Sequence, residues 1–166
     1  GDAIQDHNLV NLSQGATAIA FMNAAGYDAM TLGNHEFDYG QDVTLERAAE
    51  ADFPFLSCNI LVDATGKPFV RPYTIVKKGG VTIGIVGITT PETAGATNPK
   101  HVYGLTFLDG QDLYDAVQSN VDYLRGAGCD LVVALGHLGS EPFSESHRAD
   151  DILRHVQGID LFIDGH

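Results

Sequence analysis

The chain has 166 residues, a net charge of -13 at neutral pH and only two cysteines. Its length suits one domain with a hydrophobic core, and its near-average apolar content excludes a disordered chain. The strong negative charge argues against a surface for nucleic acid or anionic membranes, because both need basic patches. No apolar run reaches the length of a membrane span, and no signal peptide is recognisable. Cys58 and Cys129 are isolated and are expected to be buried thiols.

Strands and helices alternate along the first half of the chain. Ser13 is expected to cap a first helix that ends before Gly26. The hydrophobic pattern predicts a helix over 16–25, a strand over 27–32, a helix over 41–51 and a strand over 53–60. Two alternating runs around Gly79-Gly80 then predict a hairpin, with strands over 69–78 and 81–89.

The second half begins with a long irregular segment, 90–108, of a length that is often functional. Asp109 is expected to cap a helix over 113–125, whose apolar residues recur at helical spacing. The pattern then predicts a strand over 130–135, a helix over 144–156 and a strand over 159–163. His147 and His155 lie in polar parts of that helix and are expected to be exposed. This alternation predicts one domain over 1–166 with a layered, mostly parallel α/β core.

The most informative stretch is Gly33-Asn34-His35-Glu36-Phe37-Asp38, directly after the predicted strand 27–32. In an open α/β sheet, ligands bind beyond the carboxyl ends of the strands. The Asn34 carbonyl oxygen suits a hard or borderline cation. His35 could act as a general acid or stabilise charge, and Asp38 could orient its ring. Each residue alone is compatible with a polar loop or helix cap, but the six together favour a reaction site.

Other polar residues occupy corresponding places. Asp2 follows Gly1, His137 follows the strand 130–135, and His166 follows the strand 159–163. The ordered blocks Gly-Asp, Gly-Asn-His-Glu, Gly-His and Gly-His resemble the signature of calcineurin-like metallophosphoesterases. The extended form Gly-Asn-His-Glu-Phe-Asp is similar to the 5'-nucleotidase and UDP-sugar hydrolase branch. A lone histidine after a strand is more often structural, so it is this resemblance that favours a ligand role for His137.

The resemblance implies a layered α-β-β-α sandwich and a two-metal hydrolase. Two divalent ions, roughly 3.5–4 Å apart, would grip the phosphate and a nucleophilic hydroxide. Mn, Zn, Fe or Co would all fit such ligands. One ion is implied to be held by Asp2, Asn34, His137 and His166, with Asp2 shared by both ions. His35, steadied by Asp38, is implied to contact the phosphate and stabilise the leaving oxygen, while Glu36 is implied to be structural.

The family pattern also extends beyond both ends of this sequence. An Asp-x-His block precedes Gly-Asp in the family, and the last family block is Gly-His-x-His, of which only the first His is present. We therefore expect part of a catalytic domain that lacks the first strand of the sandwich. The resemblance also implies a C-terminal nucleoside-binding domain in the natural protein and an extracytoplasmic location.

The substrate implied by the resemblance is a nucleotide or related phosphate ester. Three alternatives of the same fold remain open: a UDP-sugar diphosphatase, a 2',3'-cyclic-nucleotide phosphodiesterase and a thiosulfohydrolase-like enzyme. An alternative of another class is a catalytically incomplete fragment or binding module that keeps the fold. Metal content and a panel of substrates would separate these possibilities.

The 166 residues by themselves are expected to bind at most one divalent ion, weakly, and to be close to inactive. Four candidate ligands serve one ion, whereas only Asp2 serves the other. Asp2 and His166 are also terminal positions, which fray unless they are tied down. Elemental analysis and a phosphate-release assay on the isolated polypeptide measure this. Two tightly held ions per chain with full turnover would contradict it.

Overall fold

The computed structural model describes residues 1–140, 142 and 147–166, and the strands in these ranges form three sheets. The smallest sheet pairs two parallel strands, β1 (Met30–Thr31) and β2 (Phe55–Leu56). The second is antiparallel, in the order β4 (Lys67–Pro68), β3 (Ile60–Val62), β7 (Leu105–Phe107). The largest has the order β5 (Tyr73–Lys78), β6 (Val81–Thr89), β8 (Leu131–His137), β9 (Leu161–Ile163).

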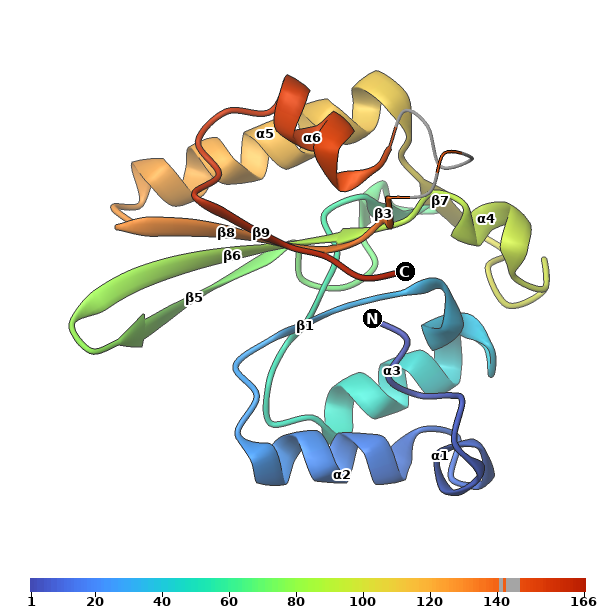
Figure 1. Ribbon diagram of the computed structural model, residues 1–166. Helices are drawn as coiled ribbons and strands as arrows, with labels where there is room; N and C mark the ends of the chain where they lie inside the picture. The colour runs from blue at the N-terminus through green and yellow to red at the C-terminus, as the bar shows by residue number, and fades with distance from the viewer. Residues whose placement is uncertain (141, 143–146) are drawn as a thin grey trace.

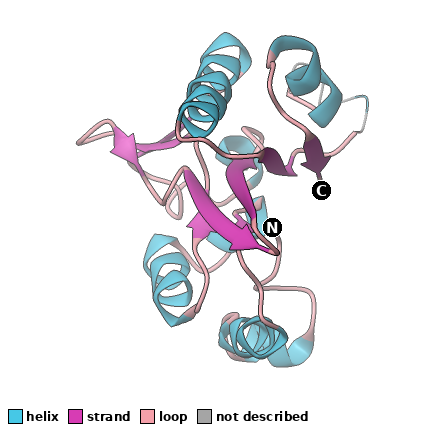
Figure 2. Ribbon diagram, turned by 90° about the vertical axis from the view of Figure 1, so that its left-hand side faces the viewer, coloured by secondary structure: helices cyan, strands magenta, loops and turns pink. Residues whose placement is uncertain are grey.

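Helices cover the strands from both sides. The described helices are α1 (Asn8–Leu12), α2 (Ala16–Ala25), the 3₁₀ helix η1 (Asn34–Phe37), α3 (Gln41–Glu50), α4 (Thr93–Ala96), α5 (Gly110–Gly126) and α6 (Ala149–His155). Figure 1 shows α5 and α6 on one face of the largest sheet, and α1, α2 and α3 beyond β1 on the other side. The turned view in Figure 2 shows the strands between these two groups of helices. The predicted layered α/β sandwich is confirmed.

Two hydrophobic clusters hold the layers together. The α5 core packs α5 and α6 on the largest sheet, and its fully buried residues include Val86, Ile88, Leu113, Val117, Val121, Leu124, Val132, Ala134 and Ile152. The α2 core packs the N-terminal helices on β1 and β2, and its residues include Ile4, Ile19, Met30, Leu32, Phe37, Phe53, Phe55 and Ile60. Each large apolar side chain that is buried in this way stabilises the folded state by about 1.5–3 kcal/mol relative to an exposed one.

Parallel pairing brings the carboxyl ends of three strands to one edge. β6 and β8 pair in parallel, and their last residues, Thr89 and His137, are directly opposite. β8 and β9 also pair in parallel, up to Leu135 and Ile163. Both chain termini lie close to this edge, between the two groups of helices (Figure 1). Residues from both ends of the sequence therefore meet where the parallel strands end.

Two predicted strands are wrong in their bounds because the chain changes sheets within them. The stretch 53–60 divides into β2 and the start of β3. Between them, the backbone N–H of Cys58 donates to the Gly87 carbonyl oxygen of β6, in the largest sheet, at 2.8 Å. The stretch 69–78 begins as a strand only at Tyr73. Its first residue, Phe69, donates to Ile60 in another sheet at 2.9 Å, and Pro72 has no N–H to donate.

Other elements differ in length or were not predicted. The strand predicted over 27–32 is confined to β1. The irregular segment 90–108 contains the short elements α4 and β7, and α1 had no clear signal in the sequence. Asp109 caps α5 as predicted, accepting a hydrogen bond from the Gly110 N–H, but the helix begins three residues earlier than expected. Residues 144–146 of the last predicted helix lie outside the described residues.

Local predictions at the first helix and the cysteines are largely confirmed. Gly15 occupies the N-cap position of α2 in a left-handed conformation, yet the Ser13 hydroxyl still accepts a hydrogen bond from Thr17 N, at 3.1 Å. Cys58 and Cys129 are free and buried, and burial raises the pKa of the Cys58 thiol to about 12. Within the described ranges, no helix is both long and apolar enough to cross a membrane.

Candidate metal centre and catalytic loop

Glu36 joins the N-terminal segment to the loop 33–38. Its side chain is fully buried, and its two oxygens accept hydrogen bonds from three backbone N–H groups. The donors are Gly33 at 2.5 Å, Ala3 at 2.6 Å and Asp2 at 2.7 Å. A buried carboxylate is stable only when it is compensated in this way. Glu36 therefore fixes the backbone around Asp2, in agreement with the structural role expected from the sequence.

Asp2 is held in an unusual conformation between two histidines. Its φ of 62° lies in the left-handed region that residues other than glycine rarely adopt. Oδ1 accepts a hydrogen bond from the His35 backbone N–H at 3.0 Å, and Oδ2 lies 2.9 Å from His137 Nε2. Burial raises the pKa of Asp2, but the hydrogen bond and charge of His137, with smaller contributions from His35, outweigh it and hold the pKa below its usual value.

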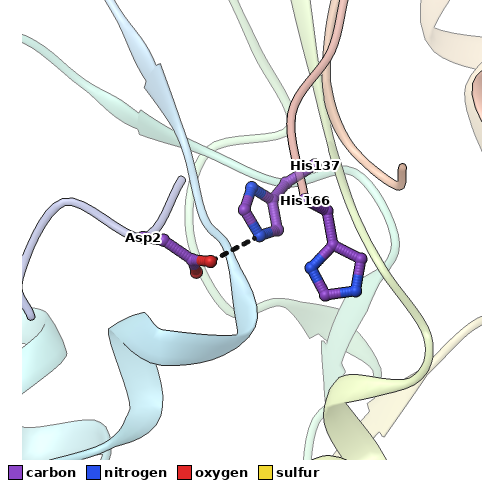
Figure 3. Close-up of side chains that lie close together, drawn as sticks. All are labelled: Asp2, His137 and His166. Carbon is purple, nitrogen blue, oxygen red and sulfur yellow. Dashed lines mark ion pairs between the residues drawn. The ribbon is translucent and has the colours of Figure 1, made fainter. Parts of the chain in front are cut away.

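The two histidines that follow β8 and β9 lie side by side. His137 ends β8 and is buried, and its ring centroid is 4.9 Å from that of His166. The backbone N–H of Leu138 donates to Asp164 Oδ1 at 2.9 Å, so the loops after the two strands are joined. Figure 3 shows His137 beside Asp2, with His166 next to it. The parallel register thus brings together the histidines that the sequence placed at neighbouring strand ends.

The atoms around His137 have the chemistry of a metal site. One potential ligand atom each from Asp2, His137 and His166 lies within 4.8 Å of the others. Asn34 Oδ1 lies 3.3 Å from the same His137 Nε2 that faces Asp2. A single N–H cannot serve two acceptors well, whereas a cation attracts both oxygens and the ring nitrogen. Carboxylate, amide and imidazole groups together suit a divalent transition metal, so the four residues fit such an ion.

His35 and Asp38 form a separate pair beside these residues. His35 Nδ1 lies 2.8 Å from Asp38 Oδ2, and each side chain is about one-third exposed, at 37% and 34%. Burial lowers the pKa of His35. The hydrogen bond to Asp38 and the charges of Asp38, Asp2 and Asp6 outweigh it, so the pKa lies above its ordinary value. Because Asp38 engages Nδ1, Nε2 is the ring nitrogen that could contact another group.

Gly33 allows the close approach of these groups. A Cβ atom at this position would overlap Asp2 Oδ1 and lie 2.9 Å from His137 Cδ2. The atoms in the way belong to a buried histidine and to a carboxylate that is itself hydrogen-bonded, so neither can move aside easily. Any side chain at Gly33 would therefore separate Asp2 from His137.

One sequence prediction near the site is wrong. His147 was expected to be exposed, but only 7% of it is. Its Nε2 lies 3.3 Å from Glu92 Oε1, and its Nδ1 lies 3.3 Å from Asp109 Oδ1. These contacts join distant parts of the chain, and no local spacing predicts them. Glu92, which also lies 3.3 Å from His166 Nε2, was missed by the sequence reasoning for the same reason. His155 is exposed, as expected.

Comparison with known proteins agrees with this geometry. No family model matches the chain. A snake venom 5'-nucleotidase of Crotalus adamanteus is 36% identical over the whole chain, which spans 27% of that protein. The 5'-nucleotidase of Homo sapiens is also 36% identical over the whole chain, which spans 28% of it. The chain thus covers little more than a quarter of the length of these relatives.

The fold of this chain, over its whole length, recurs in solved structures. The calcineurin-like phosphoesterase YfkN of Bacillus subtilis matches the whole chain with a TM-score of 0.86 and 28% identity, and the chain covers 56% of it. The sulfate thiohydrolase SoxB of Thermus thermophilus, in complex with glycerol, matches with a TM-score of 0.84 and 27% identity, and the chain covers 29% of it. With the ordered motifs gathered at one sheet edge and such relatives along its entire length, the chain belongs to the calcineurin-like phosphoesterases, in the branch that contains the 5'-nucleotidases.

Proposed function

We propose that the natural protein containing this chain hydrolyses nucleotide phosphate esters with the aid of two divalent metal ions. The observation that carries the proposal is the convergence of Asp2 Oδ2 and Asn34 Oδ1 on His137 Nε2, at 2.9 and 3.3 Å. The His35 backbone donates to the same Asp2 carboxylate, at 3.0 Å, which places the His35–Asp38 pair next to the convergence point. A phosphate ester between them would meet both groups.

The residues of this chain would hold one of the two ions. We assign its ligands as Asp2, Asn34, His137 and His166. When bound, the ions would polarise the phosphoryl oxygens and lower the pKa of a bound water, which supplies the nucleophile. Mn, Zn, Fe and Co all suit this donor set. The buried Glu36 carboxylate holds the backbone of Asp2 in place for that purpose.

His35 would act on the phosphate. Its Nδ1 is held by Asp38, so a protonated ring directs Nε2–H outward to a phosphoryl or leaving oxygen. The raised pKa keeps more of the ring protonated near neutral pH, which suits donation to an oxygen that gains negative charge. Asp38 keeps the ring in one orientation and supports its charged form. His35 and Asp38 would thus be the catalytic pair, separate from the metal ligands.

A second candidate function has a specific observation in its favour. The similarity to the sulfate thiohydrolase SoxB supports a thiosulfohydrolase-like reaction on the same metal centre. Neither a UDP-sugar diphosphatase nor a cyclic-nucleotide phosphodiesterase is among the relatives named above. The whole-chain identity of 36% to named 5'-nucleotidases favours nucleotide esters over these. A non-catalytic binding module remains the alternative of a different class.

The relatives support two further parts of the proposal, through their length and through the origin of one of them. Because these residues match only 27–28% of the Crotalus and human proteins, we propose a C-terminal nucleoside-binding domain in the natural protein. We also propose an extracytoplasmic location, which the venom origin of the Crotalus relative supports.

Metal removal tests the proposed function. The natural protein, treated with a chelator and assayed on nucleoside monophosphates, UDP-glucose, a 2',3'-cyclic nucleotide and a thiosulfate ester, is expected to lose activity. Reloading with Mn²⁺ or Co²⁺ is expected to restore it, with a nucleoside monophosphate as the best substrate. Equal activity of chelated and reloaded protein would exclude a metal-dependent reaction. Highest activity on the thiosulfate ester would favour the second candidate.

A further inference from the structure

Glu92 lies between a candidate metal ligand and a buried histidine. One carboxylate oxygen, Oε2, is 3.3 Å from His166 Nε2, and the other, Oε1, is 3.3 Å from His147 Nε2. The two contacts span 74 and 55 positions of the sequence, so they form only in the folded chain. Neither Glu92 nor His147 belongs to the group of ligand atoms that converge around His137.

The fold fixes the backbone of Glu92 relative to the metal centre. Glu92 lies three residues beyond Thr89, the end of β6, which is paired directly with His137. A tight turn follows the strand. In it the Thr93 hydroxyl donates to the Thr90 carbonyl at 2.7 Å, and the Glu92 N–H donates to the Thr90 hydroxyl at 3.3 Å. Both threonines are fully buried, so this turn is part of the core and not a loose loop.

His147 fixes the side chain of Glu92 from the other side. It is almost fully buried, and its second nitrogen, Nδ1, faces Asp109 Oδ1 at 3.3 Å, without the geometry of a hydrogen bond. Asp109 in turn caps α5. A buried imidazole between two carboxylates restricts the rotamers of both. His147 therefore connects Glu92 to the first turn of the longest helix.

We propose that Glu92 is a positioning residue for His166. It accepts the Nε2–H of His166 and leaves Nδ1 as the atom that binds the ion, while His147 holds Glu92 in place. Histidines that bind metals usually donate their other N–H to a carboxylate or carbonyl, which orients the ring and increases its basicity. This inference rests on the proposed metal site.

The test compares Glu92→Gln, Glu92→Ala and His147→Asn in the natural protein, with Co²⁺ as the probe. Removal of such a partner lowers metal affinity by about 10–100-fold. We expect Glu92→Ala to show the largest loss of Co²⁺ affinity. Glu92→Gln is expected to lose less affinity, because its amide oxygen can still accept a hydrogen bond, and His147→Asn is expected to lose the least. The visible spectrum of bound Co²⁺ is expected to change in both Glu92 variants, because the basicity of a ligand changes. A purely structural residue would not alter that spectrum.

Glu46→Gln is the matched control, since Glu46 is exposed on α3. Metal-free samples are also unfolded in urea to measure their stability. Variants at Glu92 that keep the wild-type Co²⁺ affinity and spectrum overturn the inference while the proposed function stands. An affinity loss that Glu46→Gln shares, or that matches a loss of metal-free stability, also overturns it. Wild-type protein that binds none of Co²⁺, Mn²⁺, Zn²⁺ and Fe²⁺ overturns both the inference and the proposed function.

Discussion

Replacing His35 with asparagine is expected to lower turnover by about 100-fold or more while metal content stays nearly unchanged. Asparagine cannot carry the proton that His35 holds through its pair with Asp38, at 2.8 Å. The His35 side chain lies outside the group of converging ligand atoms, so its loss leaves the ion ligands in place. Turnover on a nucleoside monophosphate and elemental analysis of the purified natural protein measure the two effects.

His7→Asn is the matched control for this substitution. His7 is exposed and caps α1, accepting a hydrogen bond from the Leu9 N–H, and asparagine is also a good N-cap residue. We expect that variant to keep wild-type turnover. Parallel losses of metal and activity in His35→Asn would instead make His35 a metal ligand, and unchanged turnover would remove it from the reaction.

Replacing Glu36 with alanine is expected to lower the free energy of unfolding by about 3 kcal/mol or more and to abolish activity. Three backbone N–H groups lose their acceptor at once: that of Gly33, which is buried, and those of Asp2 and Ala3, which are half-buried. An unsatisfied buried donor costs about 1–3 kcal/mol. The segment that carries Asp2 would also lose its attachment to the loop 33–38. Urea unfolding of the metal-free natural protein measures the change in the free energy of unfolding.

Two further variants make the Glu36 result interpretable. Glu36→Gln keeps one acceptor oxygen and is expected to fall between wild type and Glu36→Ala. Glu46→Ala removes an exposed carboxylate from α3 and is expected to change stability by about 0.5 kcal/mol or less. A Glu36→Ala protein as stable as Glu46→Ala would show that the buried carboxylate does not hold the N-terminal segment.

The sequence predicted the elements whose pattern is local. The spacing of Val117, Val121 and Leu124 indicated a helix, and all three are buried in the α5 core. The pattern failed where one apolar run serves two sheets. The stretch 69–78 looks like one strand, yet its first residue donates to Ile60 and only its later part pairs with β6. Apolar alternation records burial, but it does not record which sheet buries the residue.

The candidate site shows the same limit. The resemblance to the family's ordered motifs implied that Asp2, Asn34, His137 and His166 would meet, and each of them follows, or was expected to follow, a strand. The partners of these residues had no such signal. His147 sits in a polar stretch that favours exposure, whereas in the folded chain two carboxylates from other parts of the sequence contact its buried ring. Contacts of that kind depend on tertiary packing, which a single sequence does not display.

The two hydrophobic cores give the candidate metal site a mechanical consequence. Asp2 and Asn34 come from the half of the molecule built on the α2 core, and His137 and His166 come from the half built on the α5 core. Asn34 and His137 are 103 positions apart. An ion shared by these residues would act as a reversible cross-link that closes a long loop and clamps the halves together. Since the unfolded chain cannot gather these ligands, such an ion would favour the folded state by mass action.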